Sequence, residues 1–249
     1  MPRWPVLLYG AGCYTVFLAT VLYGAGFIAD ASFLPRTIDS GPPAPPGRAA
    51  AGNLALLALF GLQHSLMARE GLKRRWARLA PGPLERPTYV LASSLALILL
   101  FWGWRPLPAP VWETEGPFSL LLLALHLAGW ALVALATFQV HHWDLFGLRQ
   151  PWLHFTRRPY TPLPLMERGL YRHIRHPVLS GTLLAIWAAP RMTQGRLLFC
   201  AGLTLYVLLA VRWEERGLLA AHGAEYAEYR KRVPRFVPGW RRWKDARRT

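Results

Sequence analysis

The sequence predicts an all-α, polytopic integral membrane protein with about five transmembrane elements, the last of them a helical hairpin. Three observations lead to this fold class. Of the 249 residues, 53% are hydrophobic and only 17% are charged, which is unusual for a soluble domain. Apolar runs recur that approach the length needed to cross the ~30 Å hydrocarbon layer. Basic residues gather in alternate connectors between these runs. We expect one domain, residues 1–249.

Four spans are expected to be single helices. The run Val6–Ile28 exceeds the hydrocarbon thickness on its own, at ~1.5 Å per residue. The next runs are Leu54–Met67, Val90–Trp104 and Phe118–Val140. The shorter ones need flanking residues, such as 49–53, to complete a crossing.

The fifth element is expected to be a hairpin. It rises through Val178–Ala189, turns at Pro190 and Arg191, and returns through Leu197–Trp213. Because the two arms are expected to have comparable length, their outer ends should return to a similar depth. Gly181 in the ascending arm would allow a ligand or a neighbouring helix to approach closely.

Polar residues occupy both outer ends of this hairpin. Arg172, Arg175 and His176 precede the ascending arm, and Glu214 and Glu215 follow the descending arm. Guanidinium and imidazole groups suit a carboxylate, and a pair of carboxylates suits an ammonium group. The two ends together are therefore predicted to bind a zwitterionic cofactor. An interfacial cluster of snorkelling side chains is the alternative for the basic residues.

The distribution of positive charge predicts how the spans are oriented. Connectors 68–89 and 141–177 and the segment after Glu215 are rich in arginine, whereas connectors 29–53 and 105–117 hold few basic residues. The positive-inside rule places the rich connectors, both termini and the cofactor pocket on the cytoplasmic side. Topology and attraction to anionic membrane lipid account for the net charge of +16, so no nucleic-acid partner is expected.

Three residues are candidates for proton transfer. His64 lies near the cytoplasmic end of the second span, and His142 and Asp144 follow the fourth span. Polar groups inside spans are functional candidates, although His64 is equally explained as an interhelical hydrogen-bond partner of Ser65 or Gln63. The alternative for His142 and Asp144 is a solvated cluster beside the membrane. His126 lies deeper in an apolar run, and a structural role is expected for it.

No metal site is expected. Histidines are frequent in connector 141–177, but their spacing matches no familiar zinc motif. Cys13 and Cys200 fall inside predicted spans and are interpreted as packing residues. The segment Ala220–Tyr229 is expected to form a short amphipathic helix with Tyr226 and Tyr229 one turn apart, packed over the cytoplasmic opening.

Three ordered motifs carry a family resemblance. The segment Arg175–Gly181 resembles the Arg-His-Pro-x-Tyr-x-Gly signature of membrane methyltransferases related to isoprenylcysteine carboxyl methyltransferase and the phospholipid methyltransferases. Glu214 and Glu215 form the second motif, and Gly223–Pro238 resembles the end of the same superfamily. Leu179 stands where the signature usually has Tyr, so a phenol hydroxyl cannot be required there.

Two segments before the predicted hairpin indicate which family of this superfamily the chain resembles. The segments Gln63–Arg69 and Asp144–Gln150 look like those of bacterial methanethiol S-methyltransferases, so the resemblance covers most of the chain. It implies a bacterial inner-membrane enzyme that transfers a methyl group from S-adenosylmethionine to methanethiol, a small apolar thiol. The expected products are dimethyl sulfide and S-adenosylhomocysteine. Methylation of a prenylcysteine carboxylate or a phospholipid amine, or a non-catalytic membrane protein of the same fold, are the alternatives.

The resemblance also suggests roles for individual residues, while the oligomeric state stays open. Residues expected at the cofactor are Arg172, Arg175 and His176 on its carboxylate side, Glu214 and Glu215 at its ammonium or ribose, Tyr226 and Tyr229 over its adenine, and Gly181. His64 is the leading candidate to deprotonate the thiol, followed by Asp144 and His142.

Overall fold

The computed structural model describes residues 1–69, 71 and 82–239. The chain divides into two compact units, and each is described by itself. The first unit comprises Met1–Thr114, Trp143–Thr161 and Arg191–Leu203, and the second comprises Glu115–His142, Pro162–Pro190 and Thr204–Thr249. Lys73, Arg74, Arg75 and Arg78, which contributed to the predicted orientation, lie outside the described residues.

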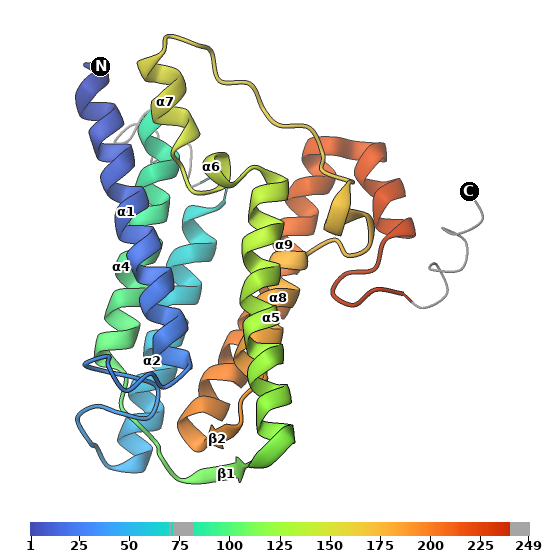
Figure 1. Ribbon diagram of the computed structural model, residues 1–249. Helices are drawn as coiled ribbons and strands as arrows, with labels where there is room; N and C mark the ends of the chain where they lie inside the picture. Colours follow the sequence, from blue (N-terminus) through green and yellow to red (C-terminus); the bar gives the residue numbers. More distant parts are fainter. Residues whose placement is uncertain (70, 72–81, 240–249) are drawn as a thin grey trace. The chain divides into compact units, whose positions relative to one another are not determined.

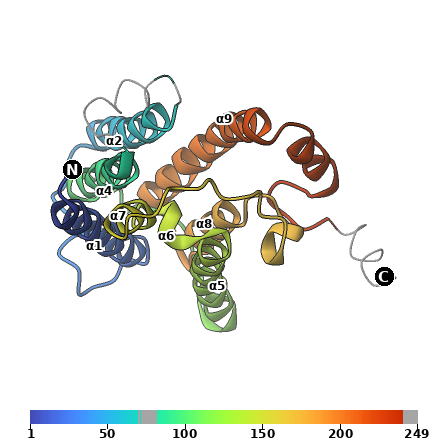
Figure 2. The ribbon, with the colours of Figure 1, turned by 90° about the horizontal axis from the view of Figure 1, so that it is seen from above.

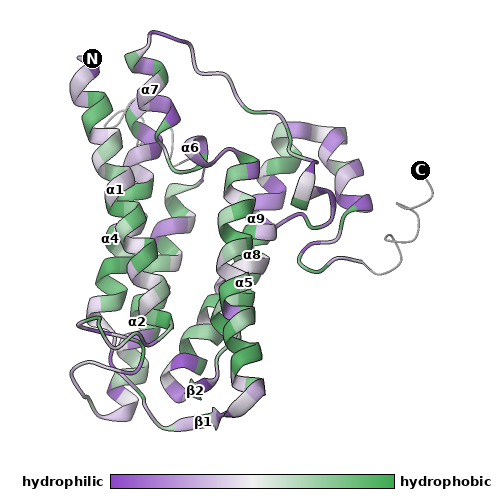
Figure 3. Ribbon diagram, in the orientation of Figure 1, coloured by the Kyte–Doolittle hydropathy of each residue, from purple (hydrophilic) through white to green (hydrophobic). Residues whose placement is uncertain are grey.

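Five helices among the described residues are long and apolar enough to cross a membrane. They are α1 (Arg3–Ile28), α2 (Pro46–Met67), α4 (Glu85–Gly103, preceded by the 3₁₀ turn η1, Gly82–Leu84), α5 (Gly116–Val140) and α9 (Gln194–Arg232). Figure 3 shows the apolar residues that cover them. The prediction of an all-α polytopic membrane protein is confirmed. The first four helices end at or within one residue of the predicted spans and begin before them.

The three N-terminal spans pack together in the first unit. Helix α4 lies against both α1 and α2, and the short α7 (Arg149–Phe155) lies on α1 (Figures 1 and 2). Aromatic rings fill the end of this bundle, with Phe27 and Phe101 at 4.9 Å between ring centroids. A Cβ atom on Gly10 would come within 2.5 Å of Pro151, so the glycine permits the close packing of α7 on α1.

A small sheet at the hairpin turn was not predicted. Strand β1 (Pro110–Glu113) pairs antiparallel with β2 (Arg191–Thr193), with Glu113 opposite Arg191. Strands of four and three residues leave too little alternation to be detected in sequence. The Thr193 hydroxyl donates to the Asp39 carboxylate at 2.5 Å, which ties the start of α9 to the connector after α1.

In the second unit, α5 and the short α8 (Pro177–Trp187) lie side by side (Figures 1 and 2). Glycines make this contact possible, because a Cβ on Gly129 would lie 2.5 Å from the Ala185 nitrogen. Helix α8 has 11 residues, so it is too short to cross a bilayer alone and is shorter than the expected ascending arm. The residues expected to form a helix at 220–229 lie in the last part of α9, where a kink at Gly223 with non-helical backbone angles (φ 54°, ψ −125°) separates two helical segments.

Candidate functional site

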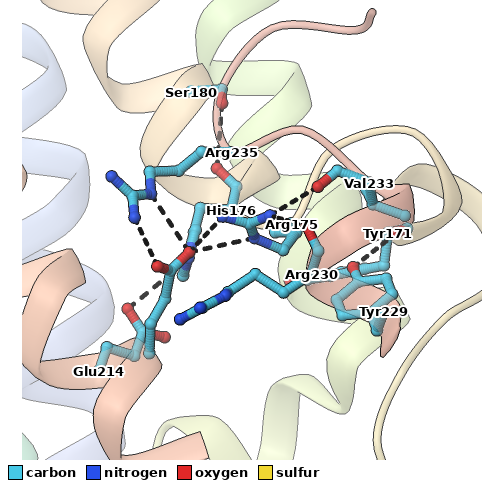
Figure 4. A network of polar contacts seen from close by, with 10 residues as sticks. Tyr171, Arg175, His176, Ser180, Glu214, Tyr229, Arg230, Val233 and Arg235 are labelled. Atoms are coloured by element: carbon cyan, nitrogen blue, oxygen red, sulfur yellow. Dashed lines mark hydrogen bonds and ion pairs between the residues drawn. The ribbon is translucent and has the colours of Figure 1, made fainter. Parts of the chain in front are cut away.

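The polar residues at the two ends of the hairpin meet around one carboxylate, that of Glu215. Figure 4 shows Arg175, His176 and Arg235 of this network. Arg175 donates to Glu215 Oε1 from Nε at 3.0 Å and from Nη2 at 2.7 Å. Arg235 donates to Oε1 from Nε at 3.2 Å and to Oε2 from Nη2 at 2.6 Å. His176 Nε2 lies 3.3 Å from Oε1. The first and second sequence motifs are therefore in direct contact.

The segment that carries these groups is held by backbone hydrogen bonds. The Arg175 amide donates to the Pro234 carbonyl at 2.9 Å, and the His176 amide donates to the Arg235 carbonyl at 3.2 Å. Pro177 then begins α8, where its missing N–H costs nothing. One turn later the Ser180 hydroxyl donates to the Phe236 carbonyl at 2.7 Å. We call residues 233–236 the strap, because they lie along the start of α8.

The two carboxylates of the Glu-Glu pair have different environments. The Glu215 side chain is 4% exposed and is neutralised by its arginine neighbours. The Glu214 side chain is 54% exposed, and its Oε2 lies 3.6 Å from His176 Nδ1. The geometry makes Glu215 an internal anchor and leaves Glu214 accessible to a ligand.

The two tyrosines of α9 are buried beside this network. Tyr226 and Tyr229 pack with Val233 in a small apolar cluster that includes Leu165. The Tyr229 hydroxyl donates to the Tyr171 carbonyl at 2.6 Å. The Tyr226 hydroxyl is buried and has no hydrogen-bond partner among the residues described. An unsatisfied buried hydroxyl costs about 1–3 kcal/mol, which a polar ligand atom would offset.

Two other predicted cofactor residues form no hydrogen bond or ion pair with Glu215 among the described residues. Arg172 is the last residue of the 3₁₀ turn η2 (Gly169–Arg172) and is exposed. Gly181 faces α5, since a Cβ there would meet the Gly129 carbonyl oxygen at 2.7 Å. The neighbour predicted for Gly181 is therefore a helix in this structure.

Sequence reasoning missed Arg235 as a site residue. It lies beyond α9, and its approach to Glu215 depends on the return of the strap to the start of α8. The hydrogen bond with Glu215 raises the pKa of the Arg235 guanidinium, so this group is always charged. The signal available in sequence was its place in the third motif, two residues after Val233.

His64 belongs to a hydrogen-bonded cluster of α2 and α4 in the first unit. Its Nδ1 lies 3.0 Å from Ser93 Oγ, and its Nε2 lies 2.8 Å from the Tyr89 hydroxyl. Ser93 donates its own hydrogen to the Tyr89 carbonyl at 3.0 Å. The serine oxygen can therefore only accept from Nδ1, and the tyrosine donates to Nε2. Both ring nitrogens have interhelical partners, as the structural alternative expects, but these are Ser93 and Tyr89 and not Ser65 or Gln63.

Asp144 lies in the same unit as His64. Arg86 connects the two regions, because its Nε donates to the Leu145 carbonyl at 2.8 Å and its guanidinium lies 5.2 Å from the Tyr89 ring centroid. Asp144 itself is paired with Arg149 at 2.9 Å. The Asp144 carboxylate is therefore already engaged by a cation of the protein.

His142 lies in the second unit, at the start of α6 (His142–Leu145). Its ring stacks on Phe138 at 4.3 Å, and its Nδ1 lies 3.0 Å from the Thr137 hydroxyl. Burial lowers the pKa of the imidazole, so His142 is neutral near pH 7. A neutral imidazole can accept a proton.

The donor set around Glu215 fits the polar end of an amino-acid cofactor. Two guanidiniums share one buried carboxylate, so one positive charge is left over for an anionic group. The exposed Glu214 carboxylate beside His176 suits an ammonium group. The fold defines a polytopic helical membrane protein, and this network supplies charged groups that could hold a zwitterionic small molecule.

Comparisons with known proteins identify the family. The family model described as NnrU protein matches residues 54–244. The chain is 46% identical over 239 residues to methanethiol S-methyltransferase of Mycobacterium tuberculosis, covering 96% of this chain and 98% of that protein. It is 45% identical over 236 residues to methanethiol S-methyltransferase 2 of Bradyrhizobium diazoefficiens, covering 95% and 91%. Nurim of Bos taurus is 38% identical over 168 residues, covering 64% and 63%.

No solved structure matches the chain significantly. The chain belongs to the NnrU protein family and, with these relatives, to the family of methanethiol S-methyltransferases. The resemblance predicted from the sequence motifs is confirmed.

Proposed function

We propose that this protein methylates methanethiol with S-adenosylmethionine, forming dimethyl sulfide and S-adenosylhomocysteine. The observation that carries the proposal is the 46% identity, over 96% of the chain, to a methanethiol S-methyltransferase. The network around Glu215 supports it, because its charges suit the amino-acid end of this cofactor. When bound, S-adenosylmethionine supplies an electrophilic methyl group on a sulfonium.

The protein's own residues bind the cofactor and manage one proton. Glu215 holds the two arginines in place, and Glu214 binds the cofactor's ammonium group beside His176. The Tyr226 hydroxyl, which has no hydrogen-bond partner among the described residues, lies near the same network. It would form a hydrogen bond with a polar atom of the cofactor's adenosine part. Tyr229 supports this arrangement through Tyr171.

The thiol must lose its proton before its sulfur attacks the methyl carbon. An alkyl thiol is mostly protonated near neutral pH, so a base is required. We assign this role to His64, whose Nε2 accepts a hydrogen bond from Tyr89 in the resting state and would accept the thiol proton instead. His142 and Asp144 follow as candidates.

Orientation and location form part of the proposal. The arginine-rich connectors favour a cytoplasmic cofactor site and cytoplasmic termini in a bacterial inner membrane. The long apolar helices are surrounded by membrane lipid. A small apolar thiol can dissolve in this lipid as well as in water. No metal is assigned a role, because transfer of a methyl group from a sulfonium needs none.

A headspace assay tests the proposed reaction. Purified protein in detergent is supplied with S-adenosylmethionine and methanethiol, and dimethyl sulfide is measured by gas chromatography. We expect release of dimethyl sulfide with an equal amount of S-adenosylhomocysteine, and slower release from Glu214→Gln at the same subsaturating cofactor concentration. Turnover of a phospholipid amine or a prenylcysteine carboxylate without turnover of methanethiol would reject the acceptor. Turnover of no acceptor would favour a non-catalytic protein.

A further inference from the structure

We propose that Arg235 binds the carboxylate of the cofactor's amino-acid end, and that Arg175 serves only to position the network. This inference rests on the proposed function and deepens it. The sequence predicted that residues before α8 bind the cofactor's carboxylate, whereas this proposal assigns that role to a residue of the strap.

Arg175 has no free pair of parallel donors for a ligand, because four of its five N–H groups donate to the protein. Its Nε and Nη2 both donate to Glu215, and its Nη1 donates to the carbonyls of Arg230 at 2.7 Å and Val233 at 2.6 Å. All three nitrogens of the guanidinium are therefore engaged with the protein. The side chain is also only 8% exposed. Arg175 joins the end of α9 to the strap and fixes Glu215 between them.

Arg235 uses only one edge of its guanidinium. Nε and Nη2 contact the two oxygens of Glu215, at 3.2 and 2.6 Å. The second edge, formed by Nη1 and the outer N–H of Nη2, has no hydrogen-bond partner among the residues that the structure describes. The side chain is 41% exposed. A free guanidinium edge offers two parallel N–H groups, the geometry that binds a carboxylate in a bidentate manner.

The backbone holds Arg235 in position before any ligand arrives. Its own carbonyl accepts the His176 amide, and the carbonyls on either side accept the Arg175 amide and the Ser180 hydroxyl. Three consecutive carbonyls of the strap are thus fixed to the start of α8. Glu215 then fixes the side chain. Little conformational entropy remains to be lost on binding, which favours affinity.

The charges around Arg235 complete the recognition of a zwitterion. Glu215 neutralises one of its two arginine partners, so the network keeps one positive charge. The carboxylate of a ligand would balance that charge at Arg235. The exposed Glu214 carboxylate then remains for the ammonium group. Arg235 and Glu214, two side chains of opposite charge, thus bind the two charged ends of the amino acid.

Two ligands that differ in the amino-acid end test the proposal. S-adenosylhomocysteine carries the amino acid, and 5′-methylthioadenosine lacks it while keeping the adenosine and sulfur. Binding of each is measured by calorimetry on the full chain in detergent. For Arg235→Ala we expect about a 10- to 100-fold loss of affinity for S-adenosylhomocysteine, because a charge-assisted bidentate contact is removed. Affinity for 5′-methylthioadenosine should change less than about twofold, since that ligand has no carboxylate.

Arg232→Ala is the matched control. Arg232 is close in sequence and also ion-paired, but with Glu167 and with its side chain 62% exposed. It should leave both affinities unchanged. Arg235→Lys keeps the charge and a contact to Glu215 while losing the fork, so it should lose affinity selectively for S-adenosylhomocysteine even if Arg235→Ala fails to fold.

The outcomes separate this proposal from the proposed function. If the unmodified protein binds S-adenosylhomocysteine but both Arg235 variants weaken the two ligands equally, Arg235 is only structural and this inference is wrong. The function would then still stand. If the unmodified protein does not bind S-adenosylhomocysteine, both proposals fail.

Discussion

The guanidinium of Arg175 contacts the carboxylate of Glu215 through two nitrogens, at 3.0 and 2.7 Å, and both side chains are buried. This pair joins the start of α8 to α9. Buried ion pairs contribute little net stability compared with apolar residues, but removing one partner leaves an uncompensated charge. Because only Glu215 belongs to this buried pair, replacement of Glu215 and replacement of Glu214 should affect the stability of the protein differently.

Glu215→Ala should destabilise the protein, and Glu214→Ala should not. Loss of the Glu215 carboxylate leaves the buried Arg175 unpaired, at a cost of about 3–5 kcal/mol in the free energy of unfolding. Glu214 is 54% exposed, so its replacement should change stability by less than about 0.5 kcal/mol. Thermal denaturation in detergent measures both. Glu214→Ala should still weaken binding of S-adenosylhomocysteine, and equal stability losses in the two variants would contradict the division of roles.

The contact between His176 and Glu215 could be predicted from the order of the sequence motifs. The length of an apolar run can be counted along the sequence. The spans and the return of the last helix could therefore be predicted without knowledge of the tertiary structure. One premise was wrong, however, because the arms were expected to be of comparable length. Helix α8 has 11 residues, whereas α9 runs from Gln194 past Glu215 to its kink at Gly223. The polar ends still meet, because Glu215 on α9 contacts Arg175 and the strap is bonded to the start of α8.

Arg235 and the β1–β2 pair could not be predicted in the same way. Arg235 reaches Glu215 only after the bend at Gly223 and the end of α9, and neither leaves a periodic pattern. Short strands such as Arg191–Thr193 likewise depend on a partner distant in sequence. Residues brought together by chain reversal outside the spans need the three-dimensional structure.

Gly181→Ala should show whether Gly181 packs against a neighbouring helix or contacts the ligand. A Cβ at position 181 would lie 2.7 Å from the Gly129 carbonyl oxygen and 2.9 Å from the Val133 nitrogen, which are backbone atoms that cannot move independently. We expect a loss of about 1–3 kcal/mol from overpacking between α5 and α8. Gly217→Ala in α9 is the control, because a Cβ there meets nothing within 4 Å. An unchanged melting temperature with weakened cofactor binding would instead place Gly181 at the ligand.

His126→Ala should destabilise the second unit by exposing an unpaired carbonyl. The amide of Ala189 bonds to Trp187 instead of Ala185, so the Ala185 carbonyl takes its hydrogen bond from His126 Nδ1 at 2.7 Å. Trp130 donates to the other ring nitrogen at 3.1 Å, which fixes a neutral tautomer. Interhelical hydrogen bonds in membranes contribute about 1–2 kcal/mol at most. Denaturation in detergent should show a loss of this size, partly restored in His126→Asn, which keeps a donor.

His142 should make stability fall in mild acid. Burial lowers the pKa of this histidine in the folded protein below the ordinary value of 6.5. The unfolded chain therefore takes up a proton first as the pH falls, which favours unfolding. Between about pH 7 and pH 5.5, the unmodified protein should lose stability relative to His142→Asn. Melting temperatures of the two proteins across this range provide the measurement, and a constant difference would show that His142 does not titrate on unfolding.

His64→Ala should reduce turnover and leave cofactor affinity intact. The ring joins α2 to α4 through Tyr89 and Ser93, in the first unit, whereas the residues around Glu215 belong to the second. Removing a general base typically costs about 10²- to 10⁴-fold in rate. The rate of dimethyl sulfide formation should therefore fall by at least the lower figure, with unchanged binding of S-adenosylhomocysteine. His64→Gln retains hydrogen bonding without basicity, so it should fold normally and remain slow. Raising the pH should partly restore its rate, because solution then supplies the thiolate. A normal rate across pH in His64→Gln would assign the histidine to the interhelical hydrogen bonds alone.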